Sequence, residues 1–509
     1  MAIHNNIASI ARSDPVTTIA VSIVILLGLL FVALKEFFKP IGLRSTRSKP
    51  PGPRGLPIFG HLLEIRKQQN DPDSKWLRSL AQYGEMATVH LGSKTWIFLN
   101  SQRVVSEIIA KRGGATNGRS PMPISSGIVS RHGRSLLLPP SGWTERRRVM
   151  HHLLSGSALK QYGEWQELES TQMLAEYLKQ PHRWYRHHYR YANSVVHRIA
   201  LGERLVKSSK DLEDLQNVVT FFVGSIGRST IDWFPDLDRL PRFMQFWRPY
   251  WERLGNWNEG IYRSWWEPVK QQIEDGTAPA SFVRDVLLNK DTKYTGSDQD
   301  AMYVAMQLIE AGSDTTREAL NIFIMASLYY PRAFKKARSE IDRVCGSNAK
   351  RLPVLADMDD LSYICAMVKE TLRWRPIFQL TPDHCVTSDF DFEGYHFSAG
   401  TGFVINEVVV CNECEDPEDF KPERWLDGHE QDAAHGLLAV RWRLFINIAR
   451  LVYCFDYTAM GPIDSRILNH HSTDEPFPVK VTIRSTAHEK LILEEATRLG
   501  VLQFAECRM

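Results

Sequence analysis

DAMYVAMQLIEAGSDTTREALNIFIMASLYY, residues 300–330, predicts a long and largely buried helix, because it lacks proline and is apolar on most of its faces. The centre of this segment departs from that pattern. Gly312 weakens a helix by roughly 1 kcal/mol, Thr315 and Thr316 can bond back to preceding carbonyls and bend it, and a buried Asp314 is costly without partners. Such a break favours a groove in which a small molecule lies against the helix and receives protons. A kink without chemistry is the alternative interpretation.

The next predicted helix, LSYICAMVKETLRWRP at residues 361–376, carries a charged pair. Glu370 and Arg373 are three residues apart, so they share a helix face and can form an ion pair. A second arginine, Arg424, follows in DPEDFKPERWLDG. We expect these three residues to form an Arg–Glu–Arg cluster, although the E-x-x-R spacing alone is a weak signal.

An earlier segment, SGWTERRRVMHHLL at residues 141–154, is also predicted to be helical. Trp143 and Arg147 are four residues apart and therefore lie on one face of that helix. An indole donor beside a guanidinium suits an anionic group.

The N-terminal end predicts a membrane anchor. Residues 16–34 contain no charged side chain, and their length is close to that needed to cross a bilayer. Lysines and arginines follow this run, so the bulk of the chain is expected on the cytoplasmic side. A cleaved signal peptide or a buried helix is the alternative. The proline-rich stretch SKPPGPRGLPIFGHL then predicts a stiff spacer between anchor and body.

The remaining chain is predicted to be mostly α with a small β region. Alternating apolar residues predict strands at residues 86–92 and 95–100, and further strand-like pieces lie between residues 377 and 410. The chain has 62 basic and 59 acidic residues, a balance that argues neither for nor against nucleic acid, and no nucleic-acid partner is expected. Its seven cysteines are scattered, which does not resemble a disulfide scaffold. Cys411 and Cys414 lack a second ligand pair for zinc and are interpreted as loop thiols.

Five of these features stand in the order typical of one family. The anchor with its PPGP hinge, W-x-x-x-R, A-G-x-D-T-T, E-x-x-R and F-x-P-E-R-W together resemble a membrane-anchored cytochrome P-450, a haem-thiolate monooxygenase of the microsomal and fungal type. The resemblance implies that Trp143 and Arg147 bind a haem propionate. It also implies that Gly312, Asp314 and Thr315 line the pocket, with Thr315 holding the oxygen and Asp314 supplying protons.

The resemblance extends to the other charged residues. It implies that Glu370, Arg373 and Arg424 form a structural cluster, and that His384, in TPDHCVTSDF, faces a propionate. It further implies a cytochrome P-450 fold, with residues 1–35 as anchor, 36–60 as basic linker and 61–509 as catalytic domain.

The resemblance implies an activity as well. The expected cofactor is haem b, and the expected reaction is oxidation of an apolar small molecule in secondary-metabolite biosynthesis. NADPH would supply electrons through a separate reductase, because the chain carries no nucleotide-binding glycine loop. The expected location is the endoplasmic reticulum membrane, crossed once, with the catalytic domain in the cytoplasm.

One element of the family pattern is missing. The signature loop F-x-x-G-x-R-x-C-x-G, whose cysteine thiolate binds the iron, has no counterpart before AAHGLLAVRWRLFINIARLVYCFDY, residues 433–457. The helix after the loop resembles the family from Gly436 onward. His435 and Cys454 are weak substitute candidates, since a histidine lacks thiolate character and Cys454 lies too far along the helix.

The missing loop leaves three interpretations open. The sequence is a gene product that lost the loop, or the protein is a non-catalytic, membrane-bound relative, or a substitute residue binds the iron. A shortened turn near Cys411 to Cys414 is a second departure from the family pattern and favours the first interpretation.

Overall fold

The computed structural model describes residues 48–68, 71–134, 143–151, 156–205, 209–429, 441–464 and 475–503. The predicted anchor at residues 16–34 lies outside these ranges. Within them, no helix combines the length and the apolar character that crossing a bilayer requires.

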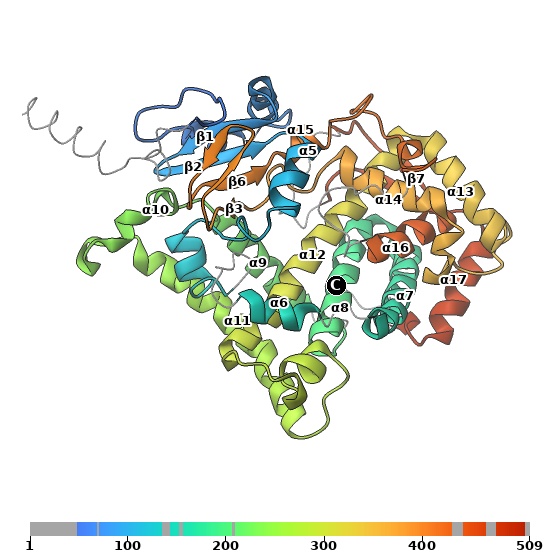
Figure 1. Ribbon diagram of the computed structural model, residues 1–509. Coiled ribbons are helices and arrows are strands. Elements are labelled where there is room, and N and C mark those ends of the chain that lie inside the picture. The colour runs from blue at the N-terminus through green and yellow to red at the C-terminus, as the bar shows by residue number, and fades with distance from the viewer. Residues whose placement is uncertain are drawn as a thin grey trace, which may run out of the picture.

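The described chain is mostly helical, with a small sheet region along one edge (Figure 1). Helix α12, Asp298–Tyr329, crosses the middle of the molecule, as the sequence predicts for residues 300–330. The Ser297 hydroxyl accepts a hydrogen bond from the backbone N–H of Asp300, and the Asp300 carboxylate accepts one from the backbone N–H of Ser297, so the two residues form a capping box. The other helices are α3 Leu62–Gln68, α4 Lys75–Ser79, α5 Gln102–Val105, α6 Trp143–His151, α7 Gly156–Lys179, α8 Trp184–Leu201, α9 Ser209–Ser225, α10 Thr230–Trp233, α11 Arg248–Glu274, α13 Pro331–Cys345, α14 Ser362–Trp374, α15 Glu407–Val410, α16 Arg441–Cys454 and α17 Thr486–Arg498.

The main sheet has the strand order β1-β2-β6-β3. Its strands are β1 Met86–Leu91, β2 Lys94–Leu99, β3 His384–Cys385 and β6 Gly402–Ile405. The first two form an antiparallel hairpin, β6 runs parallel to β2, and β3 pairs antiparallel with β6. Two further pairs join β4 Phe390–Phe392 to β5 Tyr395–Phe397, and β7 Phe455–Ala459 to β8 Val479–Ile483.

These strands confirm the β portions predicted early and late in the chain. One detail of the prediction is wrong: residues 407–410 form helix α15, although their apolar run resembles a strand. The backbone N–H groups of Val410 and Cys411 bond to Asn406 and Glu407, which closes a short helical turn after β6. Short apolar runs do not distinguish a buried strand from a buried helix.

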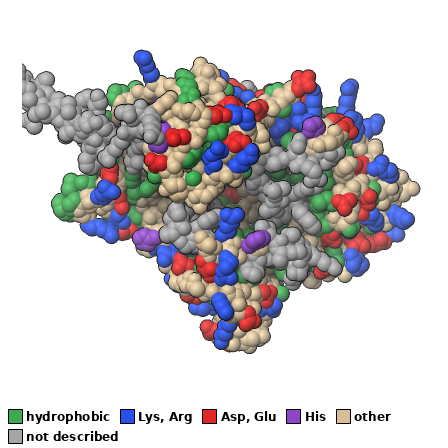
Figure 2. All heavy atoms as spheres, viewed as in Figure 1, with side chains coloured by type: hydrophobic (Ala, Val, Ile, Leu, Met, Phe, Trp, Pro, Cys, Tyr) green, Lys and Arg blue, Asp and Glu red, His purple; other side chains and the backbone are tan. Residues whose placement is uncertain are grey.

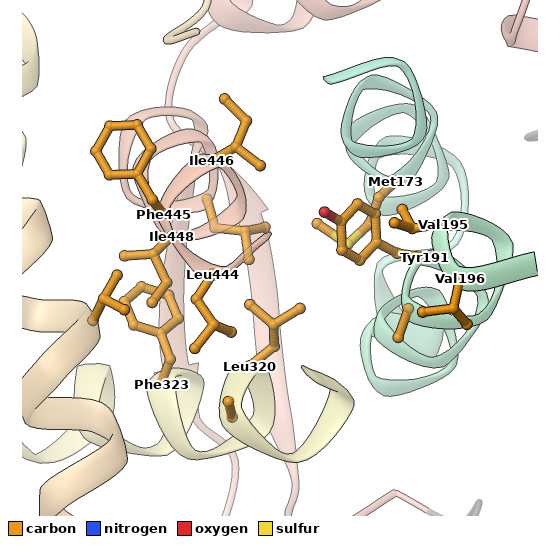
Figure 3. Packing of buried hydrophobic residues seen from close by; sticks show 14 of the residues in the cluster. Met173, Tyr191, Val195, Val196, Leu320, Phe323, Leu444, Phe445, Ile446 and Ile448 are labelled. Atoms are coloured by element: carbon orange, nitrogen blue, oxygen red, sulfur yellow. The ribbon is translucent and has the colours of Figure 1, made fainter. Parts of the chain in front are cut away.

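The largest hydrophobic core surrounds α12. It draws buried side chains from α7, α8, α14 and α16, and Figure 3 shows Leu320 and Phe323 of α12 facing α16. A second core lies between the main sheet and helices α9, α10 and α11. Helix α12 therefore has one flank against α16 and α14 and another against α8.

The proline-rich stretch is attached to the body rather than standing clear of it. Thr88 of β1 donates its hydroxyl to the carbonyl of Pro50 at 2.6 Å and its backbone N–H to Pro51 at 2.9 Å. Gly52 is needed at this contact, because a Cβ there would lie 2.0 Å from the carbonyl oxygen of Thr88. This part of the predicted spacer therefore lies along the outer strand of the sheet.

Residues 234–266 hold five tryptophans and are divided between core and surface. Trp251 and Trp266 are buried, whereas Phe243 and Phe246 are 87% and 86% exposed. Figure 2 shows hydrophobic side chains gathered at the outer end of this part of the molecule.

Candidate functional site

The middle of α12 borders open space on one face. Most of its residues are buried, but Ala311 is exposed, and Gln307, Leu308 and Asp314 are partly exposed. Residues three and four apart share a helix face, so these four form one strip, which we name the α12 face. An exposed strip in the middle of a core helix indicates a site that a small molecule can reach.

The hydroxyls beside this face bond to their own helix. Thr315 Oγ1 donates to the carbonyl of Ala311 at 2.8 Å, and Thr316 Oγ1 donates to that of Gly312 at 3.1 Å. This is the back-bonding predicted for paired threonines. The helix nevertheless continues unbroken from Asp298 to Tyr329, so the predicted break is absent from the backbone. The centre of α12 therefore differs from the rest of the helix in exposure and not in helix geometry.

Asp314 lies in a charged group that the sequence analysis did not predict. Arg317 Nη2 is 3.1 Å from Asp314 Oδ1 and 3.0 Å from Glu318 Oε1. Its guanidinium lies over the ring of Tyr189 on α8, 5.2 Å from the centroid. The i, i+3 spacing of Asp314 and Arg317 is the sequence signal that could have identified the pair. Arg317 therefore sets the orientation of the carboxylate that the resemblance assigns to proton supply.

Helix α6 carries the predicted Trp143 and Arg147. The side chain of Trp143 lies outside the described set, and that of Arg147 is exposed. The neighbouring Arg146 attaches this helix to the start of α12, through an Nη2 to Asp300 Oδ1 distance of 3.0 Å. Arg134 reaches the same carboxylate oxygen at 2.9 Å. The structure thus places Arg147 on a helix docked beside α12, with its guanidinium available to an anion.

His384 on β3 has a basic neighbour that no spacing rule identifies. Its Nδ1 lies 3.1 Å from the carbonyl oxygen of Thr116. Burial and the nearby Arg119 guanidinium lower the pKa of His384. Arg119 donates to the carbonyl of Asp383, which holds it against β3. The segment before α6 and strand β3 thus bring the Arg119 guanidinium and the His384 imidazole near one another.

The Glu370 carboxylate is the centre of a dense cluster. Arg373 approaches it with two bonds of 2.9 Å, and Arg424 Nε reaches Oε1 at 3.1 Å. The Trp425 indole donates at 2.9 Å and the Lys421 backbone at 2.7 Å. The structure therefore brings the three predicted residues together and adds two donors to them.

This cluster also holds the polypeptide around it. Arg373 donates to the carbonyls of Cys411, Pro417 and Asp419 at 3.1, 2.9 and 2.9 Å. Burial opposes its charge, but the Glu370 carboxylate outweighs that effect and raises the pKa of Arg373. The cluster fixes the chain that leads toward residues 430–440.

Helix α16 is packed as a complete core element. Residues 444–454 are all buried, and Figure 3 shows Leu444 and Ile448 beside Leu320 and Phe323 of α12. The buried Arg450 donates to the carbonyls of Pro353 at 2.9 Å and Glu167 at 2.7 Å. The helix expected after the missing loop is thus present and held from several sides.

Three of the buried cysteines in the described ranges are poor sources of a thiolate. Burial raises the pKa of Cys454 to about 12 and that of Cys385 to about 11, and it raises the pKa of Cys411 well above its usual value. A thiol must lose its proton to bind a metal, so these groups are poor ligands. Among the described ranges, no cluster of His, Cys, Asp or Glu could hold a metal ion.

The remaining candidates lie outside the described residues. His435 and Gly436 fall in the undescribed residues 430–440, and the sequence has no cysteine between Cys414 and Cys454. The α12 face and the basic side chains of Arg147, Arg119 and His384 are of the chemical kinds that a haem and its propionates need. The cysteine that should bind the iron is absent from the sequence, so no catalytic step is assigned to the chain as written.

Comparisons with known proteins agree on one family. The sequence model of the family described as Cytochrome P-450 matches residues 50–437. The match ends just after Gly436 and before α16 begins at Arg441. The matched segment therefore stops at the join that the sequence analysis identified.

Curated relatives and a solved structure match most of the chain. Cytochrome P-450 monooxygenase verL of Clonostachys rogersoniana is 32% identical, over 89% of this chain and 91% of its own length. Monooxygenase fogE of Aspergillus ruber is 30% identical, over 92% and 93%. A zebra fish cytochrome P-450 structure with abiraterone is similar in fold, with a TM-score of 0.64 at 18% identity, covering 82% of this chain and 100% of that one.

Proposed function

The chain belongs to the cytochrome P-450 family, and from that premise we propose that its fold serves the oxidation of an apolar small molecule in fungal secondary-metabolite biosynthesis. Haem supplies the oxidising chemistry in this family, and the relatives named above are monooxygenases. The observation that carries the proposal is the α12 face, an exposed strip of a core helix that includes Asp314 and lies beside Thr315.

The roles of the chain's own residues follow from their positions. The exposure of Ala311 and Leu308 supports a role as an apolar wall for the substrate. The partial exposure of Asp314, together with its ion pair to Arg317, supports a role in proton supply. Arg147, Arg119 and His384 are the basic groups available to the propionates of a haem. The Glu370 cluster positions the chain between α14 and α16.

The partners and location belong to the same proposal. Electrons would come from NADPH through a separate reductase, and the uncharged run at residues 16–34 would anchor the protein in the endoplasmic reticulum membrane. The catalytic domain would then lie in the cytoplasm, where reductase and NADPH are available.

A second function, that of a non-catalytic membrane-bound relative, is favoured by the absent ligand. The sequence runs from Cys414 to Cys454 without a cysteine, so a haem held in the chain would lack its thiolate. An enzyme whose gene product had lost the loop would have this same sequence. The non-catalytic relative and this truncated enzyme differ in whether the rest of the protein still supports the reaction once the loop is restored.

An insertion separates these cases. A segment F-x-x-G-x-R-x-C-x placed directly before Gly436 restores the family pattern, and the same segment with alanine for its cysteine is the matched control. Each purified protein is combined with a cytochrome P-450 reductase, NADPH and a panel of apolar aromatic molecules.

The proposal expects substrate-dependent NADPH consumption and an oxygenated product from the cysteine insertion only. If the cysteine insertion binds haem and consumes no NADPH with any substrate, the scaffold is non-catalytic. A product formed by the alanine insertion would show that the oxidation does not depend on the family's thiolate.

A further inference from the structure

Gln307 is a polar residue of the α12 face to which the proposed function gives no role. Its side chain is partly exposed, and its neighbours on the strip, Leu308 and Ala311, are apolar. In the described part of the chain, the Gln307 carboxamide forms no hydrogen bond. A carboxamide has two N–H donors and an acceptor oxygen. This position can therefore bind a polar group of a molecule that lies against the strip.

The side of α12 that faces α11 is already filled. Tyr262 of α11 donates its hydroxyl to Glu310 Oε1, and its ring meets that of Tyr303 edge-on, with the centroids 5.4 Å apart. Glu310 follows Gln307 by three residues and Tyr303 precedes it by four, so each lies about one turn away. Both side chains are buried and engaged with α11, and the partly exposed Gln307 amide is left to the α12 face.

The two carboxylates in line with Gln307 are each paired with an arginine. Asp300 Oδ1 is 3.0 Å from Arg146 Nη2, and Asp314 Oδ1 is 3.1 Å from Arg317 Nη2. Each carboxylate is seven residues from Gln307, which is about 10 Å along a helix. That separation is close to the screening length in ordinary salt. The charges of the strip therefore do not select an ionised group at Gln307.

A hydroxyl is the uncharged group that suits a carboxamide in either orientation. It can donate to the Gln307 oxygen or accept from the Gln307 nitrogen, whereas a carbonyl can only accept. The apolar side chains of Leu308 and Ala311 suit a ring beside that hydroxyl.

We propose that Gln307 binds a hydroxyl group of the substrate, and that the substrate is an uncharged ring system with a hydroxyl at one end. The inference rests on the proposed function, which lays the substrate along α12. Thr315, which the family resemblance puts at the reacting end, follows Gln307 by eight residues, about 12 Å along the helix. The hydroxyl therefore lies away from the carbon that is oxidised, and Gln307 acts as a specificity-determining residue through hydrogen bonding alone.

The test compares two probes that differ by the hydroxyl. 2-Naphthol carries the group, and naphthalene has the same rings without it. Equilibrium dialysis on the full chain in detergent measures the affinity of both probes for the unsubstituted protein and for Q307L. The ratio of the two affinities is compared between proteins, which cancels partitioning of the probes into detergent. The control is Q102L, which changes an exposed glutamine of α5 whose side chain also forms no hydrogen bond with the described residues.

We expect the preference for 2-naphthol over naphthalene to fall about tenfold in Q307L, because the bound hydroxyl loses its partner. Q102L should keep the preference of the unsubstituted protein. Q307N keeps a carboxamide on a shorter side chain and should retain part of the preference. Q307M is unbranched and of similar length, and it serves if thermal unfolding shows that Q307L does not fold.

Charged probes test the uncharged character of the ligand. 2-Naphthoate and 2-naphthylmethylamine, which is an ammonium ion at pH 7, should both bind more weakly than 2-naphthol. A charged probe that binds more tightly than 2-naphthol, and loses this advantage in Q307L, would contradict the proposal.

Two further results would overturn it. A preference that is unchanged in Q307L and Q307M means that water satisfies the amide, and undetectable binding of 2-naphthol means that the α12 face does not take such a molecule.

The oxidation is measured separately, on the cysteine insertion before Gly436 with reductase and NADPH. We expect 2-naphthol to be oxidised on the ring without the hydroxyl, and Q307L in that protein to spread the product over both rings. Oxidation confined to the hydroxyl-bearing ring would overturn the placement of the hydroxyl. If the cysteine insertion oxidises neither probe while Q307L still lowers the binding preference, the proposed function fails and the role of Gln307 in binding stands.

Discussion

The two helices that meet at the centre of the molecule differ in what surrounds them. Helix α12 presents an exposed strip that includes Asp314 and lies beside the buried Thr315. Helix α16 is packed and anchored just as fully, through Arg450 and its buried apolar face, but the segment before it carries no cysteine. The fold therefore keeps the packing of α16 although the segment before this helix lacks the cysteine with which the family binds iron. The packing of the core and the binding of the iron are separate properties of this site.

The largest effect should come from the cluster that leads toward the missing loop. E370A removes a buried carboxylate that accepts from Arg373, Arg424, Trp425 and Lys421. Two arginines would remain without their partner, so we expect a loss of roughly 5 kcal/mol in the free energy of unfolding. Urea denaturation followed by circular dichroism measures it.

The control for this variant is E423Q, which changes a half-exposed carboxylate that pairs with Lys336 at 2.5 Å. We expect it to cost about 1 kcal/mol or less. If E370A also cost so little, the chain that leads toward residues 430–440 would be held by contacts other than this cluster.

The packing half of the comparison is tested by a matched pair of core variants. F323A removes a buried ring from α12, and F445A removes one from α16. We expect each to lower the free energy of unfolding by about 3 to 4 kcal/mol, because both create a cavity in one shared core. A much smaller loss for F445A would mean that α16 is less firmly packed than α12, and the separation of packing from ligation would fail.

Lowering the pH should destabilise the packing of α8 against α12 before it destabilises the packing of α16. Burial lowers the pKa of His187 and His197 to about 3 and that of His188 to about 4, and all three lie on α8. The unfolded chain binds protons near pH 6.5, so stability is complete above that value. It falls by roughly 1.4 kcal/mol per pH unit for each buried histidine as the pH drops toward the folded pKa.

Hydrogen exchange at pH 7 and pH 5.5 measures this difference. Amides of α8 and α12 should lose protection at the lower pH to a greater degree than those of α16. Three such histidines lie on α8, whereas one, His488 of α17, packs against Tyr453 of α16, and burial lowers its pKa to about 4. Equal loss in all three helices would indicate one cooperative unit.

The smallest effect should come from Thr315. Its hydroxyl bonds to the carbonyl of Ala311, one turn back in its own helix. T315V keeps the shape and removes only that bond, which contributes little to helix stability, so we expect a change of about 0.5 kcal/mol or less in the free energy of unfolding. Calorimetric melting measures it, and T316V, which loses the equivalent bond to Gly312, is the control. A loss above about 2 kcal/mol would give Thr315 a structural role.

Elements of the fold that depend on a local sequence pattern could be predicted from the sequence. The α12 helix, the first two strands and α16 follow from apolar periodicity, and the Glu370 cluster follows from motif spacing. The pairing of Arg119 with His384 joins segments far apart in the chain, and no periodicity reports it. The same is true of Tyr262 and Glu310, which join α11 to α12 beside Gln307.

The central claim is that the 509-residue chain retains the scaffold of its family without the thiolate that ligates the iron. The most direct measurement is the absorption spectrum of this chain, purified with haem, reduced and exposed to carbon monoxide. We predict that the band characteristic of a thiolate–carbon monoxide complex is absent, and that it appears once the cysteine-containing segment is inserted before Gly436. The band in the chain as written, in proportion to bound haem, would contradict the account.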